Sequence, residues 1–269
     1  MKEKPIRQLY LVLAGIRGLG IVSQNRLLQM CGDIGKAFAM SEERLLEIDR
    51  SMDSRRRIGD EKIHTFAECR NDQSRYDAAS DLMQACESKG IAIITIEDET
   101  YPARLHDIIN HPLVIYALGD LRLNHFEGTV GVVGARRCSR EGKEQAIQTA
   151  QKAVLAGKAV ISGMAKGIDS YAHTAAVKEE GYTVAVLGCG PDICYPKEHR
   201  ALYEKIIFSG CVLSEYQPGE LPRKYMFPQR NRLIAALSDE LYVIDAGRNS
   251  GTHTTVEAAR QCGKRVSFM

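Results

Sequence analysis

The sequence has no paired cysteine motif, no long apolar segment and no excess of charge, and each absence removes a class of function. Its eight cysteines are scattered without a CxxC pair, so a zinc site is not indicated. No apolar run approaches the roughly 20 residues of a membrane span. Lysine and arginine number 36 against 34 acidic residues, a net charge of +2, so any anion site must come from local placement of cations.

Two nucleotide-binding motifs are also missing. The P-loop pattern GxxxxGK[ST] does not occur, and LGCGPDI carries isoleucine where the dinucleotide motif GxGxxG has its third glycine. The short apolar run LYLVLAG (9–15) has no cleavage-type tail and does not resemble a signal peptide. We therefore expect a cytoplasmic protein with reduced, mostly buried cysteines, no metal, no cofactor and no membrane contact.

From residue 91 onward, short β-branched runs alternate with helical patterns. The apolar runs indicate strands covered on both faces, and the alternation predicts an α/β fold with an extended Rossmann-like, doubly wound, mostly parallel sheet. Helices are expected over 141–157 and 168–181, where alanines recur at helical spacing before a glycine. The predicted strands are 91–96, 113–118, 129–135, 158–162, 182–187, 211–214, 240–246 and 264–268.

Residues 1–68 differ in character, because helical patterns there are broken by GIRGLG and CGDIG without a convincing strand. They predict a small helical module of the SAM or helix-hairpin type. Such a module is either a cap or interaction module, or a DNA contact through backbone amides at a glycine turn. The second predicted domain, 69–269, begins with a polar helix over 69–90 that leads to the first strand.

Loops that follow the predicted strands combine glycine with cations. Glycine lets a backbone approach a ligand, and free amides at helix N-termini favour anions. Because ligands of doubly wound sheets bind beyond the carboxyl ends of the strands, four such loops predict a phosphate-bearing ligand. Their cations are Arg136 and Arg137 in 131–142, Lys166 in 161–169, Lys197, His199 and Arg200 in 186–202, and Arg248 in 245–259.

The stretch KYMFPQRNR (224–232) is interpreted as a fifth part of this surface, a loop before the helix RLIAAL. Arg230 and Asn231 would lie near that helix's N-terminus, where a positive charge is unfavourable unless an anion neutralises it. Tyr225 and Phe227 offer flat faces for bases, although Phe227 could equally pack the loop onto the sheet.

Three other polar residues in these loops are interpreted structurally. Asp169 is expected in the first turn of a helix, His173 as a satisfied polar contact in the same helix, and Glu215 as a loop brace. No catalytic constellation is apparent, and we do not expect an enzyme.

Several motifs in register strongly resemble the DNA-processing protein A family (DprA, also called Smf). They are VGARRCSREG, ISGMAKGIDSYAH, VAVLGCGPDICYP, LSEYQPG and FPQRNRLIAALSDELYVIDAGRNSGTHTTVEAARQCGKRV, within a resemblance that runs from about residue 85 to the end. The resemblance implies a homodimeric protein that binds single-stranded DNA, protects incoming strands in natural transformation and helps to load the RecA recombinase. Family members usually continue after the last strand with Pro-Gly and often a winged-helix-like domain, whereas this sequence ends at SFM (267–269).

The resemblance also implies a set of DNA-binding residues. Phe227 would stack a base, and cations would hold phosphates. The set comprises Arg136, Lys224, Phe227, Arg230 and Arg232, the glycine turns with Ser162, Gly163, Lys166, Gly167, Ser250 and Gly251, the neighbouring Arg137 and Asn231, and Lys264.

A related group, the nucleoside monophosphate phosphoribohydrolases, provides the alternative function of a nucleotide-binding enzyme or sensor. Its motif PGGxGTxxE ends in a catalytic glutamate. The comparable stretch NSGTHTTVE has Thr255 at that place and Glu257 two residues later. The third reading, a purely structural scaffold, leaves the clustered cations unexplained.

Overall fold

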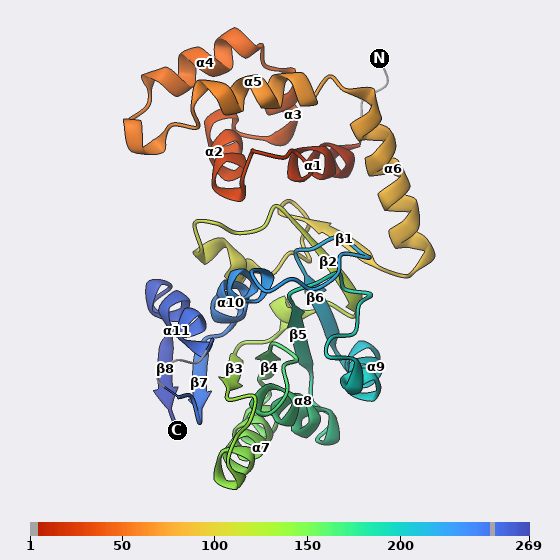
Figure 1. Cartoon of the computed structure of the whole chain (residues 1–269), viewed down its shortest axis with the longest axis vertical. Coiled ribbons are helices and arrows are strands. Elements are labelled where there is room, and N and C mark those ends of the chain that lie inside the picture. The colour runs from red at the N-terminus through yellow and green to blue at the C-terminus, as the bar shows by residue number, and fades with distance from the viewer. Residues whose placement is uncertain (1–4, 248–250) are drawn as a thin grey trace. The chain divides into compact units, whose positions relative to one another are not determined.

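Two compact units make up the chain, whose computed structural model describes residues 5–247 and 251–269 (Figure 1). One unit comprises Met1–Lys89 and Ile109–Val114, and the other comprises Gly90–Ile108 and Ile115–Met269. The boundary expected at residue 68 lies inside the first unit, because the helix that follows it, α6 (Gln73–Ser88), packs against α1 (Ile6–Ala14).

The first unit is helical, as its glycine-broken pattern predicts. Asp33, Ser41 and Asp72 each precede a helix and accept a hydrogen bond from a backbone amide of its first turn, which satisfies a donor that the helix leaves free. Besides α1 and α6, the unit contains α2 (Ile21–Cys31), α3 (Ile34–Ala39), α4 (Glu42–Ser51), the short 3-10 helix η1 (Ser54–Arg56) and α5 (Asp60–Cys69).

An eight-stranded sheet forms the centre of the second unit, in the order β1-β2-β6-β5-β4-β3-β7-β8. The six strands from β6 to β8 in this order are parallel, and β2 pairs with β6 in the antiparallel direction. Each predicted strand overlaps an observed one, so the mostly parallel α/β fold is confirmed. The strands are β1 (Ala92–Thr95), β2 (Val114–Gly119), β3 (Thr129–Gly134), β4 (Ala159–Ser162), β5 (Thr183–Leu187), β6 (Cys211–Ser214), β7 (Glu240–Ile244) and β8 (Arg265–Phe268).

Helices cover both faces of this sheet. Along β5, Val184 and Val186 are buried in one apolar cluster while Ala185 and Leu187 are buried in another, the alternation of a strand with two covered faces. α7 (Arg140–Leu155) and α8 (Ile168–Lys178) lie side by side on one face (Figure 1), and α9 (Arg200–Ser209) packs beside α8. α10 (Met226–Leu237) and α11 (Thr252–Gln261) pack together on the other face. The remaining short 3-10 helices are η2 (Ala103–Asp107), η3 (Leu123–His125) and η4 (Lys197–His199).

One local expectation is wrong: most of KYMFPQRNR is helix rather than loop. α10 begins at Met226, so Phe227, Pro228 and Arg230 lie in its first two turns. A proline near a helix start is compatible with the helix, because the amide that it lacks would have no partner there. Pro228 therefore lies within the first turn of α10, and the helix does not begin after it.

The parallel order brings the carboxyl ends of β3, β4, β5, β6 and β7 to one edge of the sheet. From β3 the chain runs through β4, β5 and β6 on one side and then returns to β7 on the other side of β3. This reversal of direction makes the edge beside β3 a topological switch point. No helix among the described residues is long and apolar enough to cross a membrane. Within the same residues, no cluster of histidine, cysteine and carboxylate side chains suits a metal ion.

Candidate nucleic-acid interface

A pocket of about 70 Å³ lies at the carboxyl edge of the sheet. It is built by the loops after β3, β4 and β5 together with the start of α10. This pocket brings together five residues of the predicted set and three that the sequence did not single out. The predicted ones are Arg136, Gly163, Lys166, Phe227 and Arg230, and the others are Ala165, Tyr195 and Pro196.

Arg230 forms the buried cationic wall of the pocket. Its side chain rises from α10, and its Nη1 atom donates to the carbonyl oxygen of Gly163 at 2.9 Å and to that of Val186. Nε donates to the side chain of Asn231 at 3.2 Å, while Nη2 donates to no described residue. Burial lowers the pKa of Arg230 and the charge of Asp169 raises it, and an arginine keeps its proton in such surroundings.

Asp169 and Gly163 set the position of this guanidinium. The Asp169 carboxylate, in the first turn of α8 as expected, accepts from the amides of Gly163 at 3.1 Å and Ala165 at 3.4 Å. Burial raises the pKa of Asp169, and the charge of Arg230 and these two amides lower it in part. Arg230 therefore does not need an external anion, contrary to the expectation from the sequence. Carbonyl oxygens and the buried carboxylate of Asp169 already face its charge.

Glycine is required at position 163 because the guanidinium lies so close. A Cβ atom there would lie 2.7 Å from Nη2 of Arg230 and 2.8 Å from the Asp169 carboxylate. The loop after β4 can therefore approach α10 only without a side chain. Gly167 has a φ of +78° at the start of α8, a conformation that favours glycine.

The remaining cations differ in their availability. Arg136 and Arg137 are exposed in the loop after β3, and Lys224 is exposed just before α10; none forms an ion pair within the described residues. Lys166 forms an ion pair with Glu198, in which the lysine side chain is 58% exposed. Such an exposed pair is weak, so a phosphate can compete for the ammonium group.

An aromatic pair borders the same pocket. The rings of Phe227 and Tyr195 lie 5.5 Å apart at an interplanar angle of 34°, and Tyr195 is 42% exposed. Tyr195 belongs to the motif ICYP in a loop already identified from its cations, but the sequence argument named only Lys197, His199 and Arg200 there. Its position across from Phe227 depends on the meeting of the loop after β5 with the first turn of α10, which no local pattern reveals.

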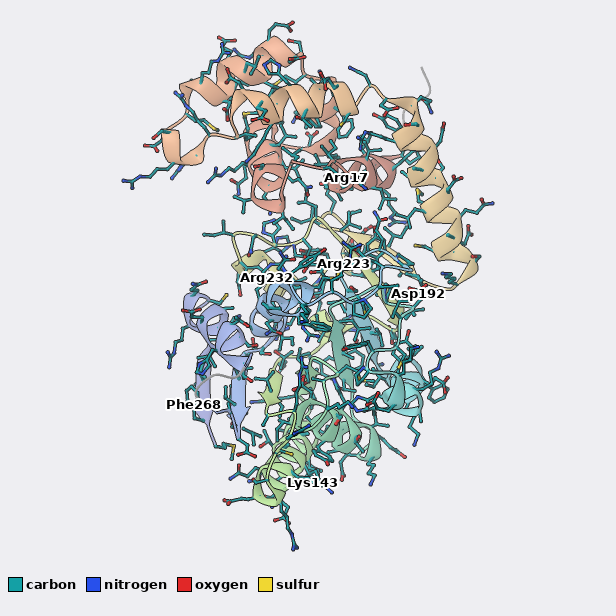
Figure 2. All side chains as sticks on the ribbon, in the orientation of Figure 1. Arg17, Lys143, Asp192, Arg223, Arg232 and Phe268 are labelled. Carbon is teal, nitrogen blue, oxygen red and sulfur yellow. The ribbon has the colours of Figure 1, made fainter. Side chains whose placement is uncertain are left out.

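Several predicted contacts have other roles or lie elsewhere. The Ser162 hydroxyl is buried and donates to the carbonyl of Val132 at 2.6 Å. Arg232 (Figure 2) forms a two-fold hydrogen-bonded ion pair with Glu215, at 2.7 and 2.6 Å, and both side chains are 13% exposed. Glu215 is thus a brace, as expected, and Arg232 is its partner.

Four residues of the predicted set remain, and the three that the structure describes are Asn231, Gly251 and Lys264. Asn231 donates to Gly251 and Thr254, which joins α10 to the start of α11, where Gly251 is exposed. Lys264 precedes β8, so it lies at the amino end of a parallel strand, the opposite edge of the sheet, and pairs with Asp107 at 3.0 Å. Ser250 and Arg248 lie outside the described residues.

His173 is buried behind the pocket in α8. Its Nδ1 atom lies 2.7 Å from the Thr183 hydroxyl, which itself donates to Val160, so Nδ1 carries the proton. Nε2 has no hydrogen-bond partner among the described residues. His173 was expected to have its polar atoms hydrogen-bonded, and only one of the two ring nitrogens is. Burial lowers the pKa of His173 to about 3, and the imidazole is neutral.

In the alternative function, a nucleotide-binding enzyme, a catalytic glutamate would stand where this chain has Thr255. Thr255 is buried in α11, 1% exposed, and Glu257 is exposed on the same helix. The pocket is lined by two exposed cations, one buried guanidinium and two aromatic rings. Such a set can hold a phosphate and present a flat apolar face beside it.

The chain resembles known proteins over most of its length. The family model described as DNA recombination-mediator protein A matches residues 92–269. DNA processing protein DprA of Streptococcus pneumoniae is 37% identical over 229 residues, which cover 83% of this chain and 79% of that protein. Protein Smf of Synechocystis is 32% identical over 262 residues, 96% of this chain and 63% of that protein.

Solved structures agree with these matches. The X-ray structure of DprA from Streptococcus pneumoniae has a TM-score of 0.75 at 30% identity, covering 100% of this chain and 87% of that one. A structure of DNA processing protein A from Helicobacter pylori, reported for its single-stranded DNA binding mode, has a TM-score of 0.60 at 28% identity, covering 65% and 80%.

Proposed function

Because the chain belongs to the DNA recombination-mediator protein A family, we propose that it binds single-stranded DNA in the pocket at the carboxyl edge of its sheet. One observation carries the proposal: a buried guanidinium, two surface cations and a pair of aromatic rings line the same pocket. Phosphate and base are the two parts of a nucleotide that such a lining recognises.

The two kinds of side chain have separate tasks in this proposal. Arg136, Lys166 and Lys224 hold backbone phosphates, with Arg230 behind them, which gives an affinity that depends on salt and tolerates any sequence. Phe227 and Tyr195 offer ring faces to unstacked bases. Bases in a duplex are already stacked on one another, so the rings favour single strands.

The wider role follows from the family resemblance. We propose that the protein works as a homodimer, protects single strands and helps to load a RecA-type recombinase during DNA uptake or recombination. The pocket supports this role because it binds the backbone without reading sequence, as a mediator of recombination between arbitrary strands must.

Fluorescence anisotropy with labelled oligo-dT and a duplex of the same length tests the binding proposal at two salt concentrations. Tight binding of the single strand, weaker binding of the duplex, and a steep loss with salt are expected. Arg136→Ala should weaken single-strand binding and lower the salt dependence by about one released counterion. Arg140→Ala is the matched control, since Arg140 is 90% exposed on α7 and pairs with Glu144.

Adenosine monophosphate as competitor separates the proposal from the alternative enzyme or sensor. A strand-binding protein releases little oligonucleotide at micromolar nucleotide, because a single nucleotide replaces only one phosphate contact. Equal affinity for duplex and single strand, or release of free base from the nucleotide, would refute the proposal.

A further inference from the structure

Five cations gather at one corner of the helical first unit, far in sequence from the pocket. Arg55 and Arg56 lie in η1, Arg57 follows it, Arg26 lies on α2 and Lys62 on α5. We call this group the arginine corner. None of the five forms an ion pair with a described residue, although many other arginines of the chain do.

Hydrogen bonds hold the corner together through carbonyl groups rather than carboxylates. Arg26 donates from Nη1 to the carbonyl of Arg57 and from Nη2 to that of Arg55, both at 2.8 Å. Arg57 donates from Nε to Met52 at 3.2 Å and from Nη2 to the carbonyl of Arg50. Carbonyl oxygens satisfy these donors without forming ion pairs. The charge of Asp60 acts on Arg57 as well as on Arg50, but it is a single negative charge beside several cations, so the corner keeps a positive potential.

The nearby carboxylates of Asp49, Asp53 and Asp60 bind backbone amides or Arg50. Asp49 is fully buried and accepts from the amides of Ile58 at 2.6 Å and Gly59 at 3.1 Å. Asp53 accepts from the amide of Arg55 as the cap of η1, and Asp60 forms an ion pair with Arg50 at 2.5 Å. The backbone of the corner is therefore fixed, and the exposed side chains of Arg55 and Arg56 extend from a fixed base.

None of the tyrosine and phenylalanine rings described in this unit is exposed. Tyr10, Phe66 and Tyr76 are buried, and Phe38 packs edge-on against Phe66. Without an exposed tyrosine or phenylalanine the corner lacks the stacking rings of the pocket, and its cations recognise chiefly negative charge. Phosphates at the regular spacing of a nucleic-acid backbone suit several guanidinium groups at once.

We propose that the arginine corner is a second DNA site, which binds the phosphate backbone of single strands and duplexes alike. This inference rests on the proposed function, because the ligand that reaches the pocket supplies the phosphates for the corner. The pocket selects single strands through its rings, and the corner adds affinity for the flanking DNA whether it is paired or not. The weaker duplex binding of the whole chain then resides in the corner.

The full chain with Arg55→Ala and Arg56→Ala tests the site. Lys36→Ala with Arg44→Ala is the matched control, because it removes two cations of the same unit that pair with Asp33 and Glu47. Anisotropy is measured with a short dT strand of about 10 nucleotides, a long one of about 40, and a duplex of the longer length, spanning the usual size of one single-strand site. Arg55→Lys with Arg56→Lys keeps the charges and reports on folding.

The alanine pair should weaken binding of the long strand and of the duplex about tenfold at low salt, and lower the salt slope on the long strand by about 1.4, for two lost phosphate contacts. Binding of the short strand should not change, and the lysine pair should bind as the unchanged protein does. If the alanine pair binds the long strand and the duplex like the control pair, the corner is not a DNA site. Loss of short-strand binding in Arg136→Ala reports on the pocket alone, so failure of the pocket and failure of the corner are separate results.

Discussion

Nη1 of Arg230 lies 2.9 Å from the carbonyl oxygen of Gly163, and this contact joins α10 to the loop after β4. The same guanidinium donates to Val186 at the end of β5, so one side chain ties three segments together at the carboxyl edge. A charge fixed in this way needs no rearrangement when an anion arrives. The pocket is thus organised before its ligand binds.

Gly163→Ala should damage both the fold and the pocket. The new methyl group would lie within 3 Å of the guanidinium that two carbonyls hold in place. A loss of about 1–3 kcal/mol in the free energy of unfolding is expected, as for other overpacked sites, together with weaker strand binding. Urea denaturation and anisotropy measure the two effects. Gly20→Ala, where the added atom meets nothing within 4 Å, should change neither.

Phe227→Ala should reduce affinity for oligo-dT by about 1–3 kcal/mol, the usual contribution of one stacked base. Its effect on the salt dependence should be small, because the ring releases no counterions. Tyr195→Ala should act in the same direction. The control is Phe208→Ala on α9, a phenylalanine that is 94% exposed and remote from the pocket lining. Equal effects of Phe208→Ala and Phe227→Ala would show that stacking in the pocket is not the cause.

Arg232→Ala should cost stability and leave strand affinity nearly unchanged. The substitution leaves the largely buried Glu215 carboxylate without its partner. A loss of about 3 kcal/mol in the free energy of unfolding is expected for such an unpaired charge. Thermal or urea unfolding gives the first quantity and anisotropy the second. Adding Glu215→Gln should recover part of the stability. A large loss of strand affinity in a folded Arg232→Ala protein would instead make Arg232 a direct contact.

The pH dependence of stability should contain a contribution from His173. Its pKa is about 3 in the folded chain and near 6.5 when exposed, so between these values the unfolded chain binds more protons. Stability therefore falls as the pH falls below 6.5, by about 1.4 kcal/mol at pH 5.5. In His173→Gln this contribution is absent, so the difference between the two proteins should shrink from pH 7.5 to pH 5.5 in urea denaturation. A constant difference would mean that His173 titrates normally.

The sequence predicted the fold well because buried parallel strands are nearly continuous apolar runs, as in TVGVVGA and YTVAVL. The shared carboxyl edge followed from the βαβ alternation, whereas the order of the strands was not predicted. Lys264 could have been assigned to the opposite edge by the same reasoning, since it precedes its strand rather than follows it. The start of α10 was missed because Pro228 was interpreted as a loop residue.

Other features depend on three-dimensional contacts and had no local signal. Tyr195, in the loop after β5, meets Phe227 in the first turn of α10, more than thirty positions later in the sequence. Arg232 and Arg230 stand two residues apart in one motif, yet helical rotation directs one toward Glu215 and the other toward the pocket. Sequence alone identified both as cations and could not separate a brace from a pocket wall.

Photocrosslinking of the full chain to a single strand with 5-halogenated uracil in place of thymine, followed by peptide mapping, locates the bound bases directly. If single-stranded DNA occupies the pocket, the crosslinks will fall on the peptides that contain Tyr195 and Phe227, and Phe227→Ala will reduce them. Crosslinks confined to other surfaces, with none on either peptide, would contradict binding in the pocket.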